Sequence, residues 1–377
     1  MPPVVIDVAA ADDVRDMVHR AVQALAEGQL VALPTETVYG VAASATNPDA
    51  VERLAAAKGR DGATPFALAV KSADDAEDYA PGWNRVARRL ARRCWPGPVT
   101  LVVEANQEEG LVRQLPQNVR DYICPQGTIG LRAPANRVIQ DVLRMLAGPI
   151  ALTSVNKHGE PPATTAEECV SALGDDLAMV LDDGPARYGQ ASSVVKLNND
   201  GFEVLREGVV GKPTLDRLSR LLVVFVCTGN TCRSPMAEAL MRDKLAKSLG
   251  VNEDELEQSG VIVASAGLAA APGGPASSQA VELMRERGAS LETHGSQQLT
   301  EHLARQADLL IALTPSHAES ILGVWPEAAP RVRLLDPDGA SIADPIGGPL
   351  EVYRLCAEQI ERGVEHHAEA ILAEIAP

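Results

Sequence analysis

The sequence predicts an α/β protein built from two domains. The chain has 377 residues, which is more than one hydrophobic core usually serves. Stretches with the apolar spacing of helices alternate with short apolar runs typical of strands, from one end to the other. Hydrophobic residues make up 46% and charged residues 23%, a globular balance that excludes disordered, collagenous and fibrous classes.

The first predicted domain begins with a helix and continues with a series of strands. Residues 12–27 place apolar side chains at helical spacing, and Gly28 ends this helix. Residues 30–35 then predict a strand that runs into a loop. Further strands are predicted at residues 100–103, 128–131, 150–153, 178–181 and 193–197. Residues 211–220 predict the last helix of this domain, so we place the domains at 1–219 and 220–377.

The second predicted domain opens with an apolar strand at residues 221–227. A polar loop and then a helix at about residues 235–249 are expected to follow. No stretch rich in Pro, Ser and Gly lies between the two halves, and no internal repeat is present.

Charge and cysteine content limit the classes of function. The net charge is −17 and both halves contain more acids than bases, which argues against a dedicated nucleic-acid binder. The first residues carry acids where a signal peptide needs bases, and the longest apolar runs are far short of the roughly 20 residues that span a bilayer. We therefore expect a cytoplasmic protein with no membrane contact. The six cysteines form no CxxC pair and no Cys/His cluster, so reduced thiols and no metal site are expected.

A motif for phosphoryl chemistry starts at the end of the predicted strand. Cys227 is separated by five residues from Arg233, which is followed by Ser234 and the predicted helix. A loop of this length can surround a phosphoryl group with backbone N–H groups, and the helix N-terminus adds positive potential. This field favours the thiolate of Cys227, and Arg233 can hold two phosphoryl oxygens in the transition state. Gly229 and Asn230 suit the positive φ angles of a tight loop.

A carboxylate far along the chain completes this constellation. Asp344 lies in a Pro/Gly loop before the last predicted helix, where it can protonate a leaving group. An Asp-Pro pair is also an ordinary way to start a turn.

Together these features resemble the low-molecular-weight protein phosphatases over residues 221–377. The resemblance also includes Ser265-Ala266-Gly267, a loop at His294-Gly295-Ser296 and a strand at residues 307–310. It implies a doubly wound parallel sheet, a phosphocysteine intermediate and no cofactor. The implied catalytic residues are Cys227, Arg233 and Asp344, and the implied phosphate loop contains Thr228, Gly229, Asn230, Thr231, Cys232 and Ser234.

Within that family the loop sequence is most similar to the bacterial protein-arginine phosphatases. The resemblance implies that Thr231 favours phosphoarginine, and that Cys232 is a second thiol able to trap an oxidised Cys227. Ile346 stands where the family often has an aromatic residue, which weakens a stack on phosphotyrosine. A protein-tyrosine phosphatase stays open as an alternative. An arsenate reductase also stays open, but it needs a relay of thiols, for which only Cys356 remains.

The first half has no single nucleotide motif, but hydroxyls and bases recur where predicted strands end. Residues 34–40 read Pro-Thr-Glu-Thr-Val-Tyr-Gly, and Lys58-Gly59-Arg60 follows a helical stretch. Such loops suit a polar concave site for phosphate and carboxylate groups.

As an ordered series, these segments resemble the YrdC-like threonylcarbamoyl-adenylate synthases over about residues 5–215. The resemblance implies a twisted α/β sheet with a concave active face. It implies that L-threonine, bicarbonate and ATP, with Mg²⁺, give threonylcarbamoyl-AMP for a tRNA modification completed by a transferase complex. The implied threonine ligands are Thr37, Arg132 and Ser192, and the implied ATP ligands are Lys58, Arg60, Thr128, Ser154, Asn156 and Arg206. Ala69 replaces a histidine that many members have.

A non-catalytic RNA-binding module stays open as the alternative for this half. The helical spacing of Arg85, Arg88, Arg89, Arg92 and Arg93 places all five on one face. We interpret this stripe as a solvated helix face rather than a tRNA contact.

Overall fold

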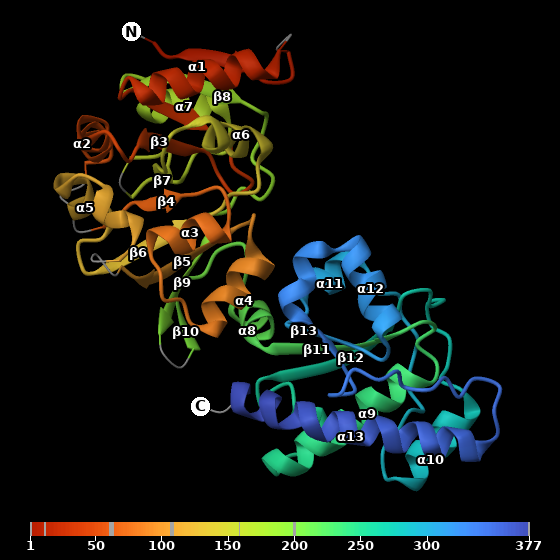
Figure 1. Ribbon diagram of the computed structural model, residues 1–377. Helices are drawn as coiled ribbons and strands as arrows, with labels where there is room; N and C mark the ends of the chain where they lie inside the picture. The colour runs from red at the N-terminus through yellow and green to blue at the C-terminus, as the bar shows by residue number, and fades with distance from the viewer. Residues whose placement is uncertain are drawn as a thin grey trace. The chain divides into compact units, whose positions relative to one another are not determined.

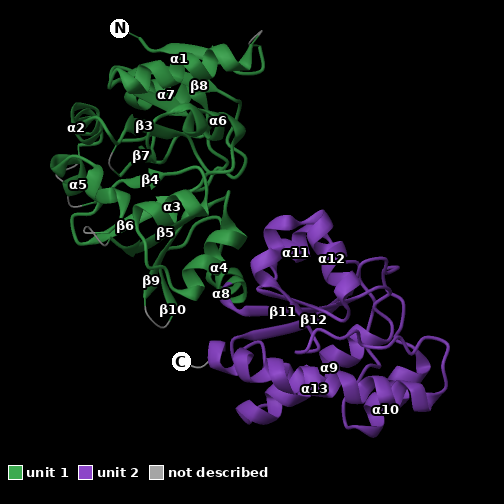
Figure 2. Cartoon of the chain, in the orientation of Figure 1, with its two compact units in different colours: residues 1–218 green, residues 219–377 purple. Residues whose placement is uncertain are grey.

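A computed structural model describes residues 2–10, 13–59, 64–105, 109–157, 159–198 and 201–375. The chain divides into two compact units, residues 1–218 and 219–377 (Figures 1 and 2).

Unit 1 is built on a ten-stranded mixed sheet. In sheet order the strands are β1 (Val4–Asp7), β8 (Leu177–Asp182), β2 (Leu30–Leu33), β3 (Gly40–Ser44), β7 (Ile150–Ser154), β4 (Ala67–Ala69), β6 (Thr128–Arg132), β5 (Val99–Glu104), β9 (Ser193–Asn198) and β10 (Gly201–Arg206). Both faces of β2 are buried, because Leu30 and Ala32 enter one core while Val31 and Leu33 enter the other.

Helices cover the two faces of this sheet unequally. One face packs on α2 (Pro48–Ala57), α3 (Ala73–Tyr79), α4 (Arg85–Cys94), α5 (Gln117–Ile123), α7 (Ala166–Leu173) and α8 (Lys212–Ser219). The other face packs on α1 (Val14–Ala26) and α6 (Arg137–Met145), through residues of β8, β2, β3, β7 and β4. The core under α1 and α6 contains no residue of β5, β6 or β9 among those described, so this part of the face is left for a cavity.

Unit 2 is a parallel sheet of four strands with helices on both faces. Its order is β12 (Val261–Gly267), β11 (Leu221–Cys227), β13 (Leu309–Ala312) and β14 (Val332–Leu334). Alternate residues of β11 enter two cores: one with α9 (Arg233–Leu249), α10 (Ser278–Glu286) and α13 (Leu350–Ile375), and one with α11 (Glu301–Gln306) and α12 (Pro315–Val324). The predicted doubly wound parallel sheet is confirmed, as is the α/β class.

Several predicted boundaries differ from the structure for physical reasons. Helix α9 begins at Arg233 rather than about Pro235, because a proline in the first turn lacks only an N–H that would have no intrahelical acceptor. The strand predicted at residues 307–310 begins at Leu309. Strands β1, β3, β4, β10, β12 and β14 were not predicted. Of these, β3 reads Gly-Val-Ala-Ala-Ser, a composition of low strand propensity, and β4 has three residues.

The prediction of a solvated arginine face on α4 is wrong for one of its members. Arg89 is only 6% exposed, and Arg93 Nη1 donates to the carbonyl of Leu218 at 2.6 Å. Arg88 behaves as expected, because it is exposed and paired with Glu77. A stripe that is partly buried against its own domain offers less charge to a polyanion than its spacing indicates.

Candidate active sites

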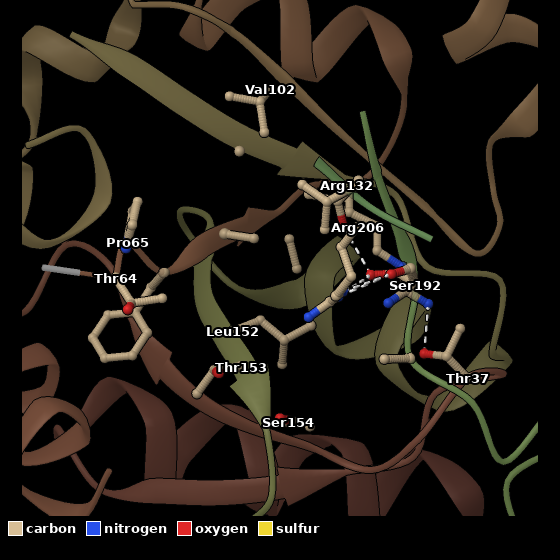
Figure 3. Close-up of a pocket in the computed structure, with 18 of the residues that line it drawn as sticks. Thr37, Thr64, Pro65, Val102, Arg132, Leu152, Thr153, Ser154, Ser192 and Arg206 are labelled. Carbon is tan, nitrogen blue, oxygen red and sulfur yellow. Dashed lines mark hydrogen bonds between the residues drawn. The ribbon is translucent and has the colours of Figure 1, made fainter. Parts of the chain in front are cut away.

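Unit 1 contains a cavity of about 520 Å³ on the open part of its sheet face. Its wall is made by the loop after β2 and by strands β4, β5, β6, β7, β9 and β10 (Figure 3). Side chains of β6 alternate across the sheet, so Thr128, Gly130 and Arg132 face the cavity together. The predicted residues on this wall are Thr37, Thr128, Arg132, Ser154, Ser192 and Arg206.

Arg132 is held at the cavity wall by a buried ion pair. Its Nη2 lies 2.7 Å from Glu36 Oε1 and donates to Thr37 Oγ1 at 2.9 Å, while its Nε donates to the carbonyl of Gly97. Glu36 Oε2 also accepts from the backbone N–H of Ala135. Within the described chain, Nη1 of Arg132 has no hydrogen-bond partner. The guanidinium is thus fixed on one side and can offer Nη1 to an anion.

A second guanidinium approaches the same cavity from the end of β10. Arg206 donates through Nε and Nη2 to the carbonyl of Ser192, whose Oγ lies 3.0 Å from Thr100 Oγ1. Gly208 allows this approach, because a Cβ there would lie 2.2 Å from the carbonyl oxygen of Ala191. Desolvation and then the charge of Arg132 lower the pKa of Arg206, so an anion between the two guanidinium groups would relieve their repulsion.

Lys58, unlike Ser154, is not among the described residues that line this cavity. It is 3% exposed, and its Nζ donates to the carbonyls of Ser154 and Asn156 and to Asn156 Oδ1. Asn156 Oδ1 also accepts from Ser154 Oγ, so the three residues form one network at the end of β7. Arg60, the neighbouring predicted ATP ligand, lies outside the described residues.

The cavity is cationic although the whole chain is acidic. Its described lining contains Arg132, Lys196 and Arg206 and no Asp or Glu side chain. Hydroxyls of Thr37, Thr128 and other residues supply neutral hydrogen-bonding groups beside these charges. Such a lining suits a ligand that carries phosphate and carboxylate groups.

The candidate site of unit 2 is the loop between β11 and α9. Cys227 ends β11 and is 2% exposed; its Sγ lies 2.9 Å from Ser234 Oγ and accepts from the backbone N–H of Asn230. Asn230 Nδ2 donates to Ser234 Oγ and to Ser265 Oγ. The Ser265 hydroxyl donates a hydrogen bond to the Glu238 carboxyl group. Burial is the main cause that raises the pKa of Glu238. The loop is thus fixed by buried side chains, with its sulfur in contact with the Ser234 hydroxyl and the Asn230 N–H.

The two residues expected to have positive φ behave differently. Asn230 has a φ of 54°, as predicted, and its Oδ1 accepts from the N–H of Gln297. The prediction is wrong for Gly229, which is absent from the left-handed region, and a Cβ there would meet only Thr231 Oγ1 at 3.7 Å. Gly229 therefore leaves space beside the loop rather than enabling its turn.

Arg233 and Asp344 meet at the mouth of this loop. Arg233 is 7% exposed, and its Nη2 pairs with Asp344 Oδ2 while its Nη1 donates to the carbonyl of Ile342. The Asp344 side chain is 44% exposed. Asp344 is 111 positions from Arg233 in the sequence, and the fold brings its carboxylate into contact with this arginine next to the phosphate loop.

The other loop residues surround the same site. Thr231 is half-buried, and Thr228 is exposed. The Sγ of Cys232 lies 3.3 Å from the hydroxyl of Tyr353 on α13, whose pKa burial raises to about 12. Burial likewise raises the pKa of Cys356 to about 12.

The side chains in these sites that sequence reasoning missed include Glu36, Lys196, His317 and Tyr353. Glu36 lies in the Pro-Thr-Glu-Thr segment directly after a buried strand. An acidic residue between two threonines at this place was the sequence signal that could have indicated it. His317 and Tyr353 contact the phosphate loop from distant helices, and nothing local in the sequence marks them.

Comparison with known proteins assigns each half of the chain. Residues 23–208 match the Sua5/YciO/YrdC family, described as telomere recombination, and residues 222–376 match the low molecular weight phosphotyrosine protein phosphatase family. A putative threonylcarbamoyl-AMP synthase of Mycobacterium tuberculosis is 38% identical over 204 residues, which cover 54% of this chain and 88% of that protein. The protein-arginine-phosphatase of Geobacillus stearothermophilus is 36% identical over 156 residues, 40% of this chain and 97% of that protein.

The chain belongs to both families. Among solved structures, Pyrococcus abyssi Sua5 complexed with L-threonine has a TM-score of 0.51 and 20% identity, covering 98% of each chain, and so has a similar fold. Both predicted resemblances are confirmed: the chain joins a domain homologous to threonylcarbamoyl-AMP synthases to a domain homologous to protein phosphatases.

Among the residues that the structure describes, no helix is both long and apolar enough to cross a membrane. No group of three or more His, Cys, Asp or Glu side chains among them is arranged to hold a metal ion.

Proposed function

We propose that this chain is a bifunctional enzyme with a synthase domain at residues 1–219 and a phosphatase domain at residues 220–377. The synthase joins L-threonine, bicarbonate and ATP into threonylcarbamoyl-AMP and releases pyrophosphate. The phosphatase hydrolyses phosphoproteins, with phosphoarginine favoured. Both reactions are assigned to the cytoplasm, where the first product passes to the transferase complex that modifies tRNA.

The convergence of Arg132, Thr37 and Ser192 on one cavity is the observation that carries the synthase proposal. Nη1 of Arg132 would hold the threonine carboxylate, and the hydroxyls of Thr37 and Ser192 would orient the amino acid. Fixing the carboxylate positions the carbamate that the threonine nitrogen forms with bicarbonate, with loss of water. A carbamate oxygen then attacks the α-phosphorus of ATP, and pyrophosphate leaves.

ATP would lie beyond the threonine, against Arg206, Thr128 and Ser154, and Ser154 is hydrogen-bonded to the network of Lys58 and Asn156. The resemblance adds Arg60 as a further ATP ligand. Because the ammonium of Lys58 already donates to three acceptors, it holds the Ser154–Asn156 segment and reaches the triphosphate only by exchanging one of them. The described cavity wall has no carboxylate, so Mg²⁺ is expected to enter as part of the substrate, held by triphosphate oxygens and water.

Pyrophosphate release tests the synthase proposal against an RNA-binding module. A synthase releases pyrophosphate from ATP only when threonine and bicarbonate are both present. A binding module retains a tRNA fragment and releases none. A cavity of about 520 Å³ favours ligands of nucleotide size over a helical duplex.

The phosphatase proposal rests on Cys227, Arg233 and Asp344 meeting around one loop. Cys227 Sγ attacks the phosphorus and forms phosphocysteine, while the backbone of residues 228–232 and the Arg233 guanidinium bind the three equatorial oxygens. Ser234 and Asn230 donate toward the sulfur and favour its thiolate. Asp344 gives its proton to the leaving group, then accepts one from the water that hydrolyses phosphocysteine.

Arg233 has to exchange partners when substrate binds. Its Nη2 is paired with Asp344 in the free site, and a phosphoryl oxygen would take that position. This exchange frees Asp344, which is already 44% exposed, to face the leaving group.

Phosphoarginine is the favoured substrate because of two loop positions. Thr231 is half-buried within the phosphate loop, where its hydroxyl and methyl can contact a planar guanidinium. Ile346 is 71% exposed and gives a phosphotyrosine ring no aromatic partner. Side-by-side kcat/KM values on matched phosphopeptides, with Cys227→Ser as the inactive control, test this preference; a higher value for phosphotyrosine contradicts it.

The arsenate reductase alternative is less favoured. A thiol relay needs a third cysteine that ionises, whereas Cys356 is 2% exposed and burial raises its pKa to about 12.

A further inference from the structure

A buried histidine on α12 contacts the phosphate loop from outside it. His317 is 5% exposed, and its Nε2 lies 2.9 Å from Thr228 Oγ1. Its Nδ1 lies 3.0 Å from the hydroxyl of Thr314, the residue that caps α12, and its backbone N–H donates to the same hydroxyl. The ring therefore joins the residue after Cys227 to the start of a helix.

The electrostatic surroundings keep this ring neutral near neutral pH. Burial first, and then the charge of Arg233, lower the pKa of His317 to about 4, while Asp344 acts in the opposite direction. A neutral imidazole donates at one nitrogen and accepts at the other, and a hydroxyl can take either role. The two threonine hydroxyls thus match a neutral ring in either tautomer.

The other end of the contact lies at the mouth of the site. Thr228 is exposed, although it follows Cys227 directly and supplies the first backbone N–H of the loop. Packing holds an exposed side chain less firmly than a buried one, so the hydrogen bond between Thr228 Oγ1 and a buried ring favours the rotamer that points toward His317. His317 is itself fixed by the cap of α12, and this makes it a rigid anchor.

We propose that His317 is a positioning residue of the phosphatase site, whose imidazole fixes Thr228 and with it the first turn of the phosphate loop before a phosphoryl group binds. This inference rests on the proposed phosphatase function. A loop that is already in its binding conformation loses less entropy when the anion enters, so the effect falls on phosphate affinity and KM more than on kcat.

Two substitutions separate the two ring contacts. His317→Asn places an amide near Nδ1 and keeps the Thr314 contact, whereas His317→Gln reaches the Nε2 position and keeps the Thr228 contact. We expect His317→Asn to raise KM for para-nitrophenyl phosphate and the Kd of inorganic phosphate about fivefold, the factor given by about 1 kcal/mol for one hydrogen bond. His317→Gln should recover most of this loss, and His302→Asn, at an exposed histidine of the same unit, should have no effect.

Thr228→Val completes the test from the other side of the contact. It should raise KM and Kd by the same factor, and the His317→Asn, Thr228→Val double variant should be no worse than either single change. Three results would overturn the proposal. The first is additive effects in the double variant, and the second is a KM and Kd of His317→Asn that equal the wild-type values. The third is an equal loss of affinity in His317→Asn and His317→Gln together with a lower Tm. If His317→Asn fails to fold, Thr228→Val alone decides. If the wild-type chain hydrolyses nothing, the proposed function fails, while the Kd of phosphate still tests His317.

Discussion

Replacing Arg132 with methionine should affect the stability of unit 1 and not only its chemistry. The Arg132 and Glu36 side chains are 8% and 7% exposed, and their ion pair spans 2.7 Å. Methionine fills much of the arginine volume but supplies no charge, so the Glu36 carboxylate stays buried without its counter-ion.

The magnitude follows from what remains around Glu36. Removing one partner of a buried ion pair typically costs about 3–5 kcal/mol of unfolding free energy. Glu36 Oε2 keeps its hydrogen bond from the N–H of Ala135, so the lower end of this range, about 3 kcal/mol, is expected. With an m-value of about 1–3 kcal/mol/M in urea, the midpoint should fall by roughly 1 M or more.

A second substitution distinguishes this cause from lost packing. The Glu36→Gln, Arg132→Met double variant contains no buried charge at this position, so it should recover most of the lost stability. Urea unfolding of the whole chain can be followed by tryptophan fluorescence, because Trp83 and Trp95 lie in the core of unit 1. Neither variant should release pyrophosphate at threonine concentrations that saturate the wild type.

Two results would refute this reasoning. One is a single variant that unfolds at the wild-type urea concentration, which would mean that the pair contributes nothing. The other is a double variant that is as unstable as the single one, which would assign the loss to packing. Recovered synthase activity in the double variant would instead remove Arg132 from the threonine site.

Four other substitutions are expected to have separable effects. Lys58→Ala should raise the apparent KM for ATP about tenfold or more and leave phosphatase activity unchanged; full pyrophosphate release at low ATP would remove Lys58 from the site. Asp344→Asn should lower kcat on phenyl phosphate by about 10²-fold or more, and less on para-nitrophenyl phosphate, whose leaving group needs no proton; equal losses would exclude Asp344 as the acid. Thr231→Ile should shift the kcat/KM ratio of matched phosphopeptides toward phosphotyrosine, and an unchanged ratio would show that this position does not set specificity. Gly267→Ala should impair hydrolysis and lower the Tm of unit 2, because its Cβ would lie 2.5 Å from the carbonyl oxygen of Thr228; Gly323→Ala, with nothing within 4 Å, is the matched control and should do neither.

Local sequence was sufficient where the chain builds a feature from adjacent residues. The strand, loop and helix around Cys227 could be predicted because apolar residues, a short polar loop and a helix follow one another without interruption. The positive φ of Asn230 followed in the same way from its place in that loop.

Contacts between distant residues could not be predicted from the sequence. Arg132 pairs with Glu36 across 96 positions, and the ammonium of Lys58 meets Asn156 across 98. Which hydroxyl or carbonyl an arginine or lysine reaches depends on strand order, which here places β6 next to β4 and β5. The burial of Arg89 has the same origin: helical spacing shows which residues share a face, whereas packing decides whether that face is exposed.

Both sites place cationic side chains in an acidic chain. This charge distribution argues against a polyanion as the ligand of unit 1. The chain carries a net charge of −17, yet the described wall of its cavity contains three cations and no carboxylate. The net negative charge repels an extended nucleic acid, whereas a small phosphorylated ligand that enters the cavity meets Lys196, Arg206 and the Arg132 guanidinium that is paired with Glu36. In unit 2, likewise, the buried Arg233 next to the phosphate loop provides a local positive charge in an acidic chain. Binding at both sites should therefore depend on small anionic groups that fit inside. The proposed ligands meet this requirement: ATP with threonine in unit 1 and a phosphorylated side chain in unit 2.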